Sequence, residues 1–456
     1  MSLNKIHEHI DSNMNTYIQE LMNLVAYPSV SSQKEEVRSC GLYLNELMNE
    51  IGFQSSLYET NGNPIVFGTL QGDSHQGPTI LFYGHYDVQP PDPLEDWQSP
   101  PFKPEIRNGR IYGRGTGDNK GQFLCHLLAI KSYMETHGSL PITVKVILDG
   151  EEEIGSPSLL GFVQDNEKML KADVVLTSDG PIHDSGSPMV VFGVRGVMNF
   201  ELILETGKID NHSGNKGGII KNAAWEMVNL LSTMKDDEGN VVIEGFYDDV
   251  FKPTDYDMTL IDALPFNPDS MAEVCQVKSI DLDKRTFFER LMFWPTLTIN
   301  GLNSGHIGPG TKNIVPHKAV AKMEVRLVLD QDPVDILRKV ENHVKRSHAM
   351  VQVVSQEEDM RPSRTSAELE VSKAVVEAVA KGFGEKPIVM PSMGGSLPDF
   401  VWTKGLGVPS IMIPYANADE ANHAPNENMS IECFNKGIHA SAQIIYELSK
   451  LTEKID

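Results

Sequence analysis

The sequence predicts an α/β protein whose larger domain has a central, mainly parallel sheet flanked by helices. Four short apolar runs with polar or turn residues at their ends support this class, because strands covered on both faces of a sheet read as continuous hydrophobic segments. Helical patterns lie between them, as in proteins that alternate strands and helices. The four runs are residues 79–83, 142–148, 174–176 and 409–413.

The first helix is expected at the N-terminus, where apolar residues recur every four positions. Those residues are Ile10, Met14, Ile18 and Met22. A second helix is predicted at residues 34–51 and ends at Gly52. A third is predicted at residues 120–137, with Asp118 or Asn119 as its N-cap, because short polar side chains satisfy the free N–H groups of a first helical turn.

The pattern changes near Arg195, where alternating apolar and polar residues predict half-exposed antiparallel strands. The expected elements are strands at residues 199–206, 319–329 and 349–354 and helices at residues 220–234 and 333–346, with a less regular stretch at 235–295. We therefore predict a smaller α+β domain at residues 195–361, inserted into the larger domain, which is made of residues 1–194 and 362–456. The larger domain resumes with a helix at residues 366–381.

Composition excludes several classes of protein. The net charge of -24 argues against nucleic acid and anionic membrane surfaces, which are bound through lysine and arginine. No apolar run is long enough for a membrane span, and the N-terminal residues lack the features of a secretory signal. The four cysteines show no close pairing, so free thiols in a reducing cytoplasm are expected.

Acids and histidines that could bind metal occur in five segments, and all of them except Asp118, which lies at a predicted helix start, come after a predicted strand. The residues are His85 with Asp87, Asp118, Glu152 with Glu153, Asp179, and His423. Each alone could close an ordinary turn. Residues at the carboxyl ends of strands in an α/β sheet nevertheless point into one crevice. A set of imidazoles and carboxylates suits zinc, manganese or cobalt, and two such ions with a water between them form a hydrolytic centre.

The run of Glu151, Glu152 and Glu153 has two interpretations. Three adjacent glutamates are usually a solvated surface. This run ends a buried strand, where like charges are costly unless cations offset them. One carboxylate could then bind metal while its neighbour accepts a proton. A phosphate-binding loop at residues 113–121 is a weaker alternative, because the Gly-Lys-Ser/Thr sequence is absent.

Seven segments occur in the order found in a known family. They are HYDVQP, GRGTGDNKG, GEEEIGS, SDG, DNHSG, GGSLP and NHAPNE. Through these segments the chain resembles the dinuclear zinc-peptidase family of carnosinase, cytosolic nonspecific dipeptidase, aminoacylase and succinyl-diaminopimelate desuccinylase. Within that family it is most similar to the carnosinase and nonspecific dipeptidase branch. The resemblance covers nearly the whole chain.

The resemblance implies a role for each acid and histidine. Asp118 would bridge two divalent metal ions, zinc by preference, and a cis peptide would follow it. His85 and Asp179 would bind one ion, and Glu153 and His423 the other. Glu152 would be the general base, and Asp87 would orient His85. Gly155 and Ser156 set this register within the glutamate run.

The resemblance also gives the inserted domain a role in dimerisation and as a lid. His212 would reach the active site of the partner subunit in a homodimer and stabilise the oxyanion. Arg326 would bind a substrate carboxylate, because guanidinium binds carboxylate with two parallel hydrogen bonds. Backbone N–H groups of Gly394, Gly395 and Ser396 would also face the substrate.

The predicted function is metal-dependent hydrolysis of a peptide bond, as in a dipeptidase or exopeptidase. An N-acyl-amino-acid deacylase or desuccinylase using the same site is the alternative. A non-catalytic metal-binding protein is disfavoured, because every expected metal ligand and the base are present. The expected partners are therefore a small peptide or N-acyl amino acid and a second copy of the chain.

Overall fold

The computed structural model describes residues 2–74, 77–348, 350–356 and 359–451. Its main sheet has eight strands with parallel pairing at β8–β4, β4–β9, β9–β20 and β10–β19 and antiparallel pairing elsewhere. In spatial order the strands are β1 (Gln54–Tyr58), β2 (Ile65–Leu70), β8 (Val144–Asp149), β4 (Ile80–His85), β9 (Val174–Thr177), β20 (Ser410–Met412), β10 (Met189–Val191) and β19 (Ile388–Met390). The predicted α/β class with a mainly parallel sheet is confirmed.

Helices cover both faces of this sheet, and strand β4 shows how. Ile80 and Phe82 pack into the larger core, whereas Leu81 and Tyr83 pack into a core on the opposite face. The first face carries α1 (Leu3–Val25), α2 (Lys34–Ile51), α3 (Lys120–His137), α12 (Glu370–Phe383) and α13 (Ile431–Leu448). The second carries α4 (Leu159–Asp165) and α5 (Glu167–Leu170). Burial of successive side chains on opposite faces explains the unbroken apolar runs.

The buried stripe of α1 differs from the prediction. Ile10 is fully buried, but Met14, Ile18 and Met22 are only partly buried at the edge of the core. The fully buried residues of the helix are Ile6, Ile10, Tyr17, Leu21, Leu24 and Val25. Because α1 packs against both α3 and α13, its contact face is wider than a single row of residues four apart.

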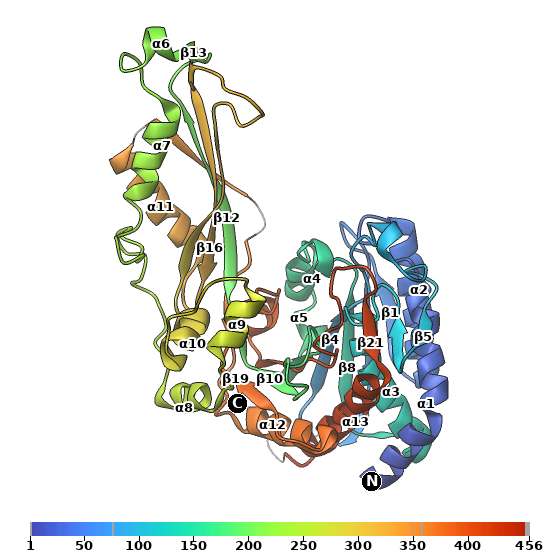
Figure 1. The fold of residues 1–456 in the computed structure, drawn as a ribbon. Coiled ribbons are helices and arrows are strands. Elements are labelled where there is room, and N and C mark those ends of the chain that lie inside the picture. The colour runs from blue at the N-terminus through green and yellow to red at the C-terminus, as the bar shows by residue number, and fades with distance from the viewer. Residues whose placement is uncertain (1, 75–76, 349, 357–358, 452–456) are drawn as a thin grey trace.

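A second, antiparallel sheet has its own core. In spatial order its strands are β14 (Thr296–Ser304), β16 (Lys318–Leu327), β12 (Gly196–Glu205) and β17 (Val351–Ser355). Helices α7 (Ala223–Ser232) and α11 (Pro333–Ser347) pack on it. Figure 1 shows this layer beside the main sheet, with β13 (Asn211–His212) and α6 (Ser213–Lys216) at its far tip. Ala349, which begins the predicted strand at 349–354, lies outside the described residues.

The stretch expected to be irregular, residues 235–295, contains three helices. They are α8 (Asp255–Ala263), α9 (Pro268–Val274) and α10 (Lys284–Phe293). Each begins after a residue whose side chain accepts backbone hydrogen bonds: Thr254, Asn267 and Asp283, respectively. The segments are short, so their apolar periodicity is too brief to be seen without these caps. None of the helices that the structure describes is long and apolar enough to cross a membrane.

A buried histidine makes the stability of the main core dependent on pH. His126 on α3 stacks on Phe82, and its Nδ1 lies 2.9 Å from Ser441 Oγ. Burial lowers the pKa of His126 to about 3. The unfolded chain takes up a proton near pH 6.5 and the folded chain does not, so the free energy of unfolding falls as the pH drops below about 6.5.

We expect this difference between the folded and unfolded pKa of His126 to lower the free energy of unfolding of the wild type by about 2 kcal/mol when the pH falls from 7 to 5. The variant His126→Asn cannot titrate there, and its amide can keep the contact with Ser441. Urea unfolding at the two pH values should therefore show a smaller loss of stability in the variant. Equal losses in the two proteins would show that His126 does not control the acid sensitivity.

Candidate active site

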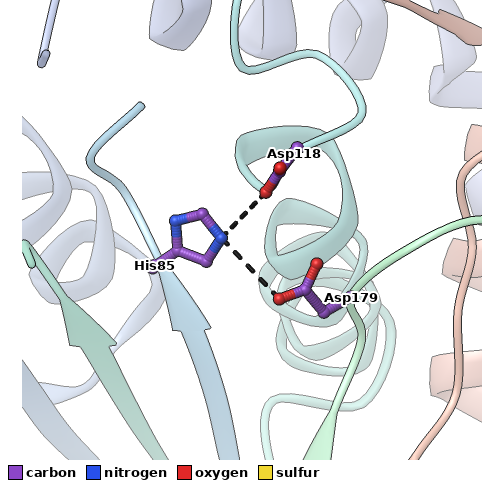
Figure 2. Close-up of side chains that lie close together, drawn as sticks. All are labelled: His85, Asp118 and Asp179. Atoms are coloured by element: carbon purple, nitrogen blue, oxygen red, sulfur yellow. Dashed lines mark ion pairs between the residues drawn. The ribbon is translucent and has the colours of Figure 1, made fainter. Parts of the chain in front are cut away.

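Three residues from different segments form a first cluster at the carboxyl ends of neighbouring strands. His85 ends β4, Asp179 follows the adjacent parallel strand β9, and Asp118 precedes α3. His85 Nε2 lies 2.9 Å from Asp118 Oδ1 and 3.7 Å from Asp179 Oδ2 (Figure 2). All three side chains are buried, and each offers a ligand atom to one point.

A second cluster shares Asp118 with the first. His423 Nε2 lies 3.0 Å from Asp118 Oδ2 and 3.1 Å from Glu153 Oε2. Asp118 therefore turns one carboxylate oxygen towards each cluster, which is the arrangement of a bridging ligand. The side chain of His423 is half-exposed, so the second cluster lies nearer to solvent.

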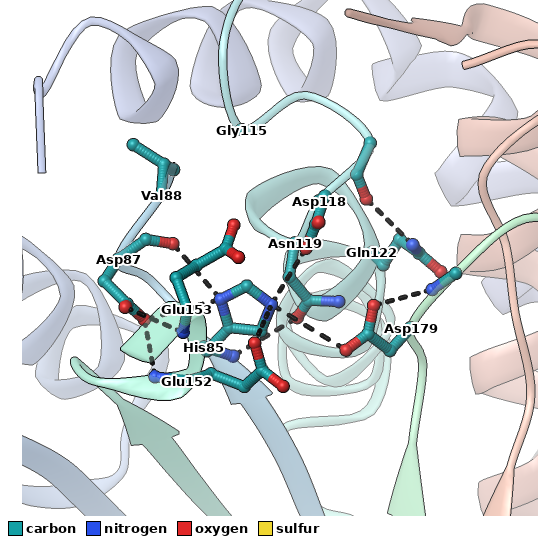
Figure 3. A network of polar contacts seen from close by, with 12 residues as sticks. His85, Asp87, Val88, Gly115, Asp118, Asn119, Gln122, Glu152, Glu153 and Asp179 are labelled. Carbon is teal, nitrogen blue, oxygen red and sulfur yellow. Dashed lines mark hydrogen bonds and ion pairs between the residues drawn. The ribbon is translucent and has the colours of Figure 1, made fainter. Parts of the chain in front are cut away.

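The three side chains of the glutamate run point to three different places: one to each cluster and one into the protein interior. Glu152 and Glu153 lie in a 3-10 turn directly after β8, and their carboxylates point in different directions (Figure 3). Glu152 Oε2 lies 3.9 Å from His85 Nε2, whereas Glu153 belongs to the second cluster. Glu151 is buried and turned away, where it accepts hydrogen bonds from the backbone N–H groups of Asn63 and Ser158 at 2.8 and 3.2 Å.

Asp87 contacts more than the histidine it was expected to orient. Its Oδ1 lies 3.4 Å from His85 Nδ1, and the same nitrogen lies 3.1 Å from the backbone oxygen of Asp87. The carboxylate also accepts the backbone N–H groups of Glu152 and Glu153, both at 3.1 Å, and the hydroxyl of Ser31 at 2.7 Å. Asp87 thus holds the glutamate turn as well as the imidazole (Figure 3).

Asn119 is the N-cap residue of α3, one of the two expected candidates, but its side chain has a different role from the expected one. The side chain makes no capping hydrogen bond. Instead, Oδ1 accepts the backbone N–H of His85 at 3.2 Å, and Nδ2 donates to the backbone oxygen of Ser178 at 2.6 Å. The peptide bond between Asp118 and Asn119 is cis. Asn119 therefore joins the three segments that carry the first cluster.

Gln89 is a second contact that sequence reasoning missed. Its backbone N–H donates to Glu153 Oε1 at 3.2 Å, and its side-chain amide donates to Glu153 Oε2 at 3.0 Å. These bonds fix the carboxylate that faces His423. Gln89 lies within the HYDVQP segment, so its place in that motif was the available signal.

The two imidazoles are surrounded by negative charge. Burial opposes a positive charge on His85, yet the nearby Asp118 and Asp87 carboxylates raise its pKa well above the ordinary value. Hydrogen bonds to Asp118 and Glu153 raise the pKa of His423 to about 10. Each ring is thus held where a positive charge is strongly favoured.

The carboxylates crowd one another. Burial and the Asp118 carboxylate raise the pKa of Asp179 to about 7. Burial, with Asp179 nearby, raises the pKa of Glu152 well above its ordinary value. Burial opposes the charge on Asp118, but hydrogen bonds with His423 and His85 lower its pKa. Such crowding in a buried place is relieved by cations.

These residues fit a pair of divalent cations. The buried His85 Nε2 has no hydrogen-bond partner of good geometry in the part of the chain that the structure describes, although a carboxylate oxygen is 2.9 Å away. A metal ion would use the lone pair of that nitrogen. Two imidazoles and three carboxylates, arranged around one shared Asp118, are the donor set that zinc, manganese and cobalt accept.

Three of the expected substrate-binding residues, Gly394, Gly395 and Ser396, lie on the segment between β19 and β20, and the fourth, Arg326, contacts Ser396 from the second sheet. Arg326 Nη1 on β16 donates to Ser396 Oγ at 2.9 Å, and the same guanidinium is paired with Glu324. The backbone oxygens of Gly394 and Gly395 accept hydrogen bonds from Arg195, each at 3.0 Å. The loop is therefore held between the two sheets by arginines.

His212 lies far from both clusters within a single chain. It is exposed on β13, at the far tip of the second sheet, while β4 lies in the main sheet (Figure 1). Its Nδ1 accepts the backbone N–H of Gly214 at 3.0 Å. The structure thus brings together the five expected metal ligands, Asp87 and Glu152, but not His212.

A mainly parallel sheet whose strand ends gather two acid-histidine clusters around one carboxylate defines a metal-dependent hydrolase. The model of peptidase family M20/M25/M40 matches residues 81–447. The chain belongs to this family.

Curated relatives match over nearly the whole chain. The Cys-Gly metallodipeptidase dug1 of Schizosaccharomyces pombe is 27% identical and covers 99% of each chain. The Beta-Ala-His dipeptidase of Rattus norvegicus is also 27% identical, over 99% of this chain and 96% of the relative. The chain is thus similar to metallodipeptidases from end to end.

Solved structures have the same architecture. The M20 family metallo-carboxypeptidase Sso-CP2 from Sulfolobus solfataricus has a TM-score of 0.87 at 32% identity, covering 95% of this chain and 99% of its own. Human carnosine dipeptidase 1 has a TM-score of 0.79 at 24% identity, covering 98% of this chain and 99% of its own. The second likeness shows the fold alone.

Proposed function

We propose that the chain hydrolyses dipeptides with two metal ions held by the two clusters and with Glu152 as the general base. The observation that carries the proposal is the sharing of Asp118 between the clusters, with Glu152 beside the first and outside both ligand sets. His85 and Asp179 would hold one ion, Glu153 and His423 the other. Zinc is the ion we favour; manganese or cobalt would suit the same donors.

The chemistry follows from these positions. Bound metal ions would polarise the scissile carbonyl and lower the pKa of the attacking water. Glu152 takes the proton from that water and returns it to the nitrogen of the leaving amine. Arg326 pairs with the substrate carboxylate, and N–H groups of Gly394, Gly395 and Ser396 hold the substrate backbone. A histidine N–H stabilises the oxyanion, which we assign to His212 of the second subunit.

A substrate panel tests the proposal. Relatives named as dipeptidases favour a free dipeptide over an N-acyl amino acid, so we expect kcat/KM for dipeptides such as Cys-Gly or β-Ala-His to exceed that for their N-acetylated amino acid counterparts at least tenfold. Assays with added zinc, manganese or cobalt would identify the active ion. Faster cleavage of N-acyl or N-succinyl amino acids would instead support the deacylase alternative.

We propose that residues 195–361 form a lid and dimerisation domain. Strand β14 is at the edge of the second sheet and exposes Ile299 and Leu302, which are 48% and 52% exposed. On α7, Trp225 is 66% exposed. Apolar side chains beside a free strand edge are typical of surfaces that pair with a second chain. Such pairing would let the tip that carries His212 reach the other subunit.

Mixed dimers test the role of His212. We expect Glu152→Gln and His212→Ala each to be inactive as homodimers. In a mixed dimer, the subunit that keeps Glu152 receives His212 from its partner, so one of the two sites works. Random mixing should restore about one quarter of the wild-type activity, because half of the dimers are mixed. No recovery, with mixed dimers detected by mass spectrometry, would rule out donation in trans.

We also propose a cytoplasmic location. Cys40, Cys125 and Cys433 are buried free thiols, and the exposed Cys275 is free as well. Unpaired cysteines suit a reducing compartment.

A further inference from the structure

Glu427 is a fully buried acid outside both clusters, yet four bonds connect it to the segment that carries Asp118. Its Oε1 accepts the backbone N–H groups of Gly115, Gly117 and Asp118 at 3.0, 2.9 and 3.0 Å. Its Oε2 accepts Arg114 Nη1 at 2.6 Å. A single carboxylate thus satisfies three backbone donors of the glycine-rich loop and one buried guanidinium.

These bonds determine where the shared ligand can lie. The N–H of Asp118 itself is bound to Glu427, so the backbone is held directly at the residue whose two oxygens face the two clusters. Gly115 has a φ of 91°, which side-chain-bearing residues rarely adopt, and the loop bends there around the carboxylate. The loop contains three glycines, whose backbone freedom must be removed by such contacts.

The same residue belongs to the segment that carries His423. The backbone oxygen of Glu427 accepts the N–H of Gly113 at 3.0 Å, so main chain and side chain both join the two segments. Between His423 and Glu427 the chain is irregular, and His423 and Asn426 both have positive φ. The position of His423 relative to Asp118 therefore depends on contacts such as those of Glu427.

We infer that Glu427 is a positioning residue that sets the spacing between Asp118 and His423, and thereby the affinity of the second metal ion. The inference rests on the two-metal site of the proposed function. A purely structural ion pair with Arg114 would stabilise the fold without a specific effect on metal binding. The three N–H bonds to the loop distinguish the two roles, because only they act on the ligand segment.

The test is metal affinity in the variant Glu427→Gln. A glutamine has the same shape, but its NH₂ group would face either the loop N–H groups or Arg114. Titration of the metal-free protein with Co²⁺ against a chelating dye should show one of the two sites bound about 10- to 100-fold less tightly than in the wild type. The visible spectrum of the Co²⁺ protein should change, and excess metal should restore part of kcat.

Asp257→Asn is the matched control. Asp257 is as buried as Glu427 and is paired with Arg364, but it lies on α8 and belongs to neither cluster. We expect it to lower thermal stability while leaving Co²⁺ affinity unchanged. Glu427→Gln with wild-type Co²⁺ affinity and spectrum would overturn the inference, whatever its stability.

Glu427→Asp carries the test if Glu427→Gln does not fold. It keeps the negative charge but shortens the side chain, so the carboxylate can no longer reach all three loop N–H groups. Co²⁺ affinity should fall, and an unchanged affinity would again overturn the inference. A wild-type protein that binds no pair of metal ions would contradict the proposed function itself. That result is distinct from a variant that binds them as the wild type does.

Discussion

Replacing Glu152 with glutamine is expected to lower kcat by about 10²- to 10⁴-fold while both metal ions remain bound. Glutamine keeps the shape of the side chain but cannot accept the proton of the attacking water. Glu152 belongs to neither ligand set, and its Oε2 lies 3.9 Å from His85 Nε2. The measurements are kcat with a dipeptide substrate and metal content by elemental analysis.

The neighbouring Glu151 provides the control within the same run. Its carboxylate holds the N–H groups of Asn63 and Ser158 and is turned away from both clusters. Glu151→Gln should lower thermal stability but leave kcat of the folded protein within a few-fold of wild type. The reverse pattern, with Glu151 essential and Glu152 dispensable, would show that the register of the run is shifted by one residue. Metal loss from Glu152→Gln would make Glu152 a ligand.

The proximity of His85, Asp179 and the glutamate run could be predicted, because it follows from the parallel direction of the strands that precede them. His85 and Asp179 follow apolar runs, and the carboxyl ends of neighbouring parallel strands lie at the same edge of a sheet. The run that ends in Glu152 and Glu153 joins the same edge, because β8 pairs with β4 in parallel. Periodicity and the residues after each run were therefore sufficient to bring these segments together.

Asp118 and His423 are different, because neither follows a predicted strand directly. Asp118 lies in a glycine-rich loop and His423 in an irregular segment, and composition alone does not place such segments. Their expected roles came from the resemblance. The structure places both within hydrogen-bond distance of one another.

The contacts that support the clusters could not be predicted from local pattern. An asparagine before a helix is ordinarily a cap, so nothing marked Asn119 as the partner of His85 and Ser178, 34 and 59 positions away. Glu427 binds a loop about 310 positions earlier. Such partners are determined by the packing of whole elements, which a single sequence does not encode as a periodic signal.

The fold shows the same limit. Long amphipathic and fully buried elements were predictable, and the helix expected at 34–51 is α2 with those bounds, ended by Gly52 in a left-handed conformation. The three helices within 235–295 were missed, because short helices depend on their caps and on packing against other parts of the chain. Here α8 and α10 pack against each other and against β19. Half-exposed strands of the second sheet were predictable from their alternation, since one face is covered and the other is not.

Chelation of the metal ions is expected to abolish activity and to destabilise the main domain. Asp118, Glu152, Glu153 and Asp179 are gathered in a mostly buried space, and metal binding offsets their repulsion. At free metal about 100 times Kd, each site would contribute about 2.7 kcal/mol to the free energy of unfolding. Removal of both ions should therefore lower Tm by roughly 5–10 °C.

The contribution of each cluster can be separated by changing one histidine at a time. His423→Ala removes a half-exposed ligand of the second cluster only, so it should leave one ion bound and lose about half of the chelator-dependent shift in Tm. His85→Ala empties a fully buried position and should cost additional stability through the cavity it creates.

If chelation left Tm and activity unchanged, protonation alone would have to relieve the repulsion between the crowded carboxylates. Repeating the unfolding at two pH values would then reveal the bound protons as a steep rise in stability with falling pH, because the folded state would bind more protons than the unfolded state.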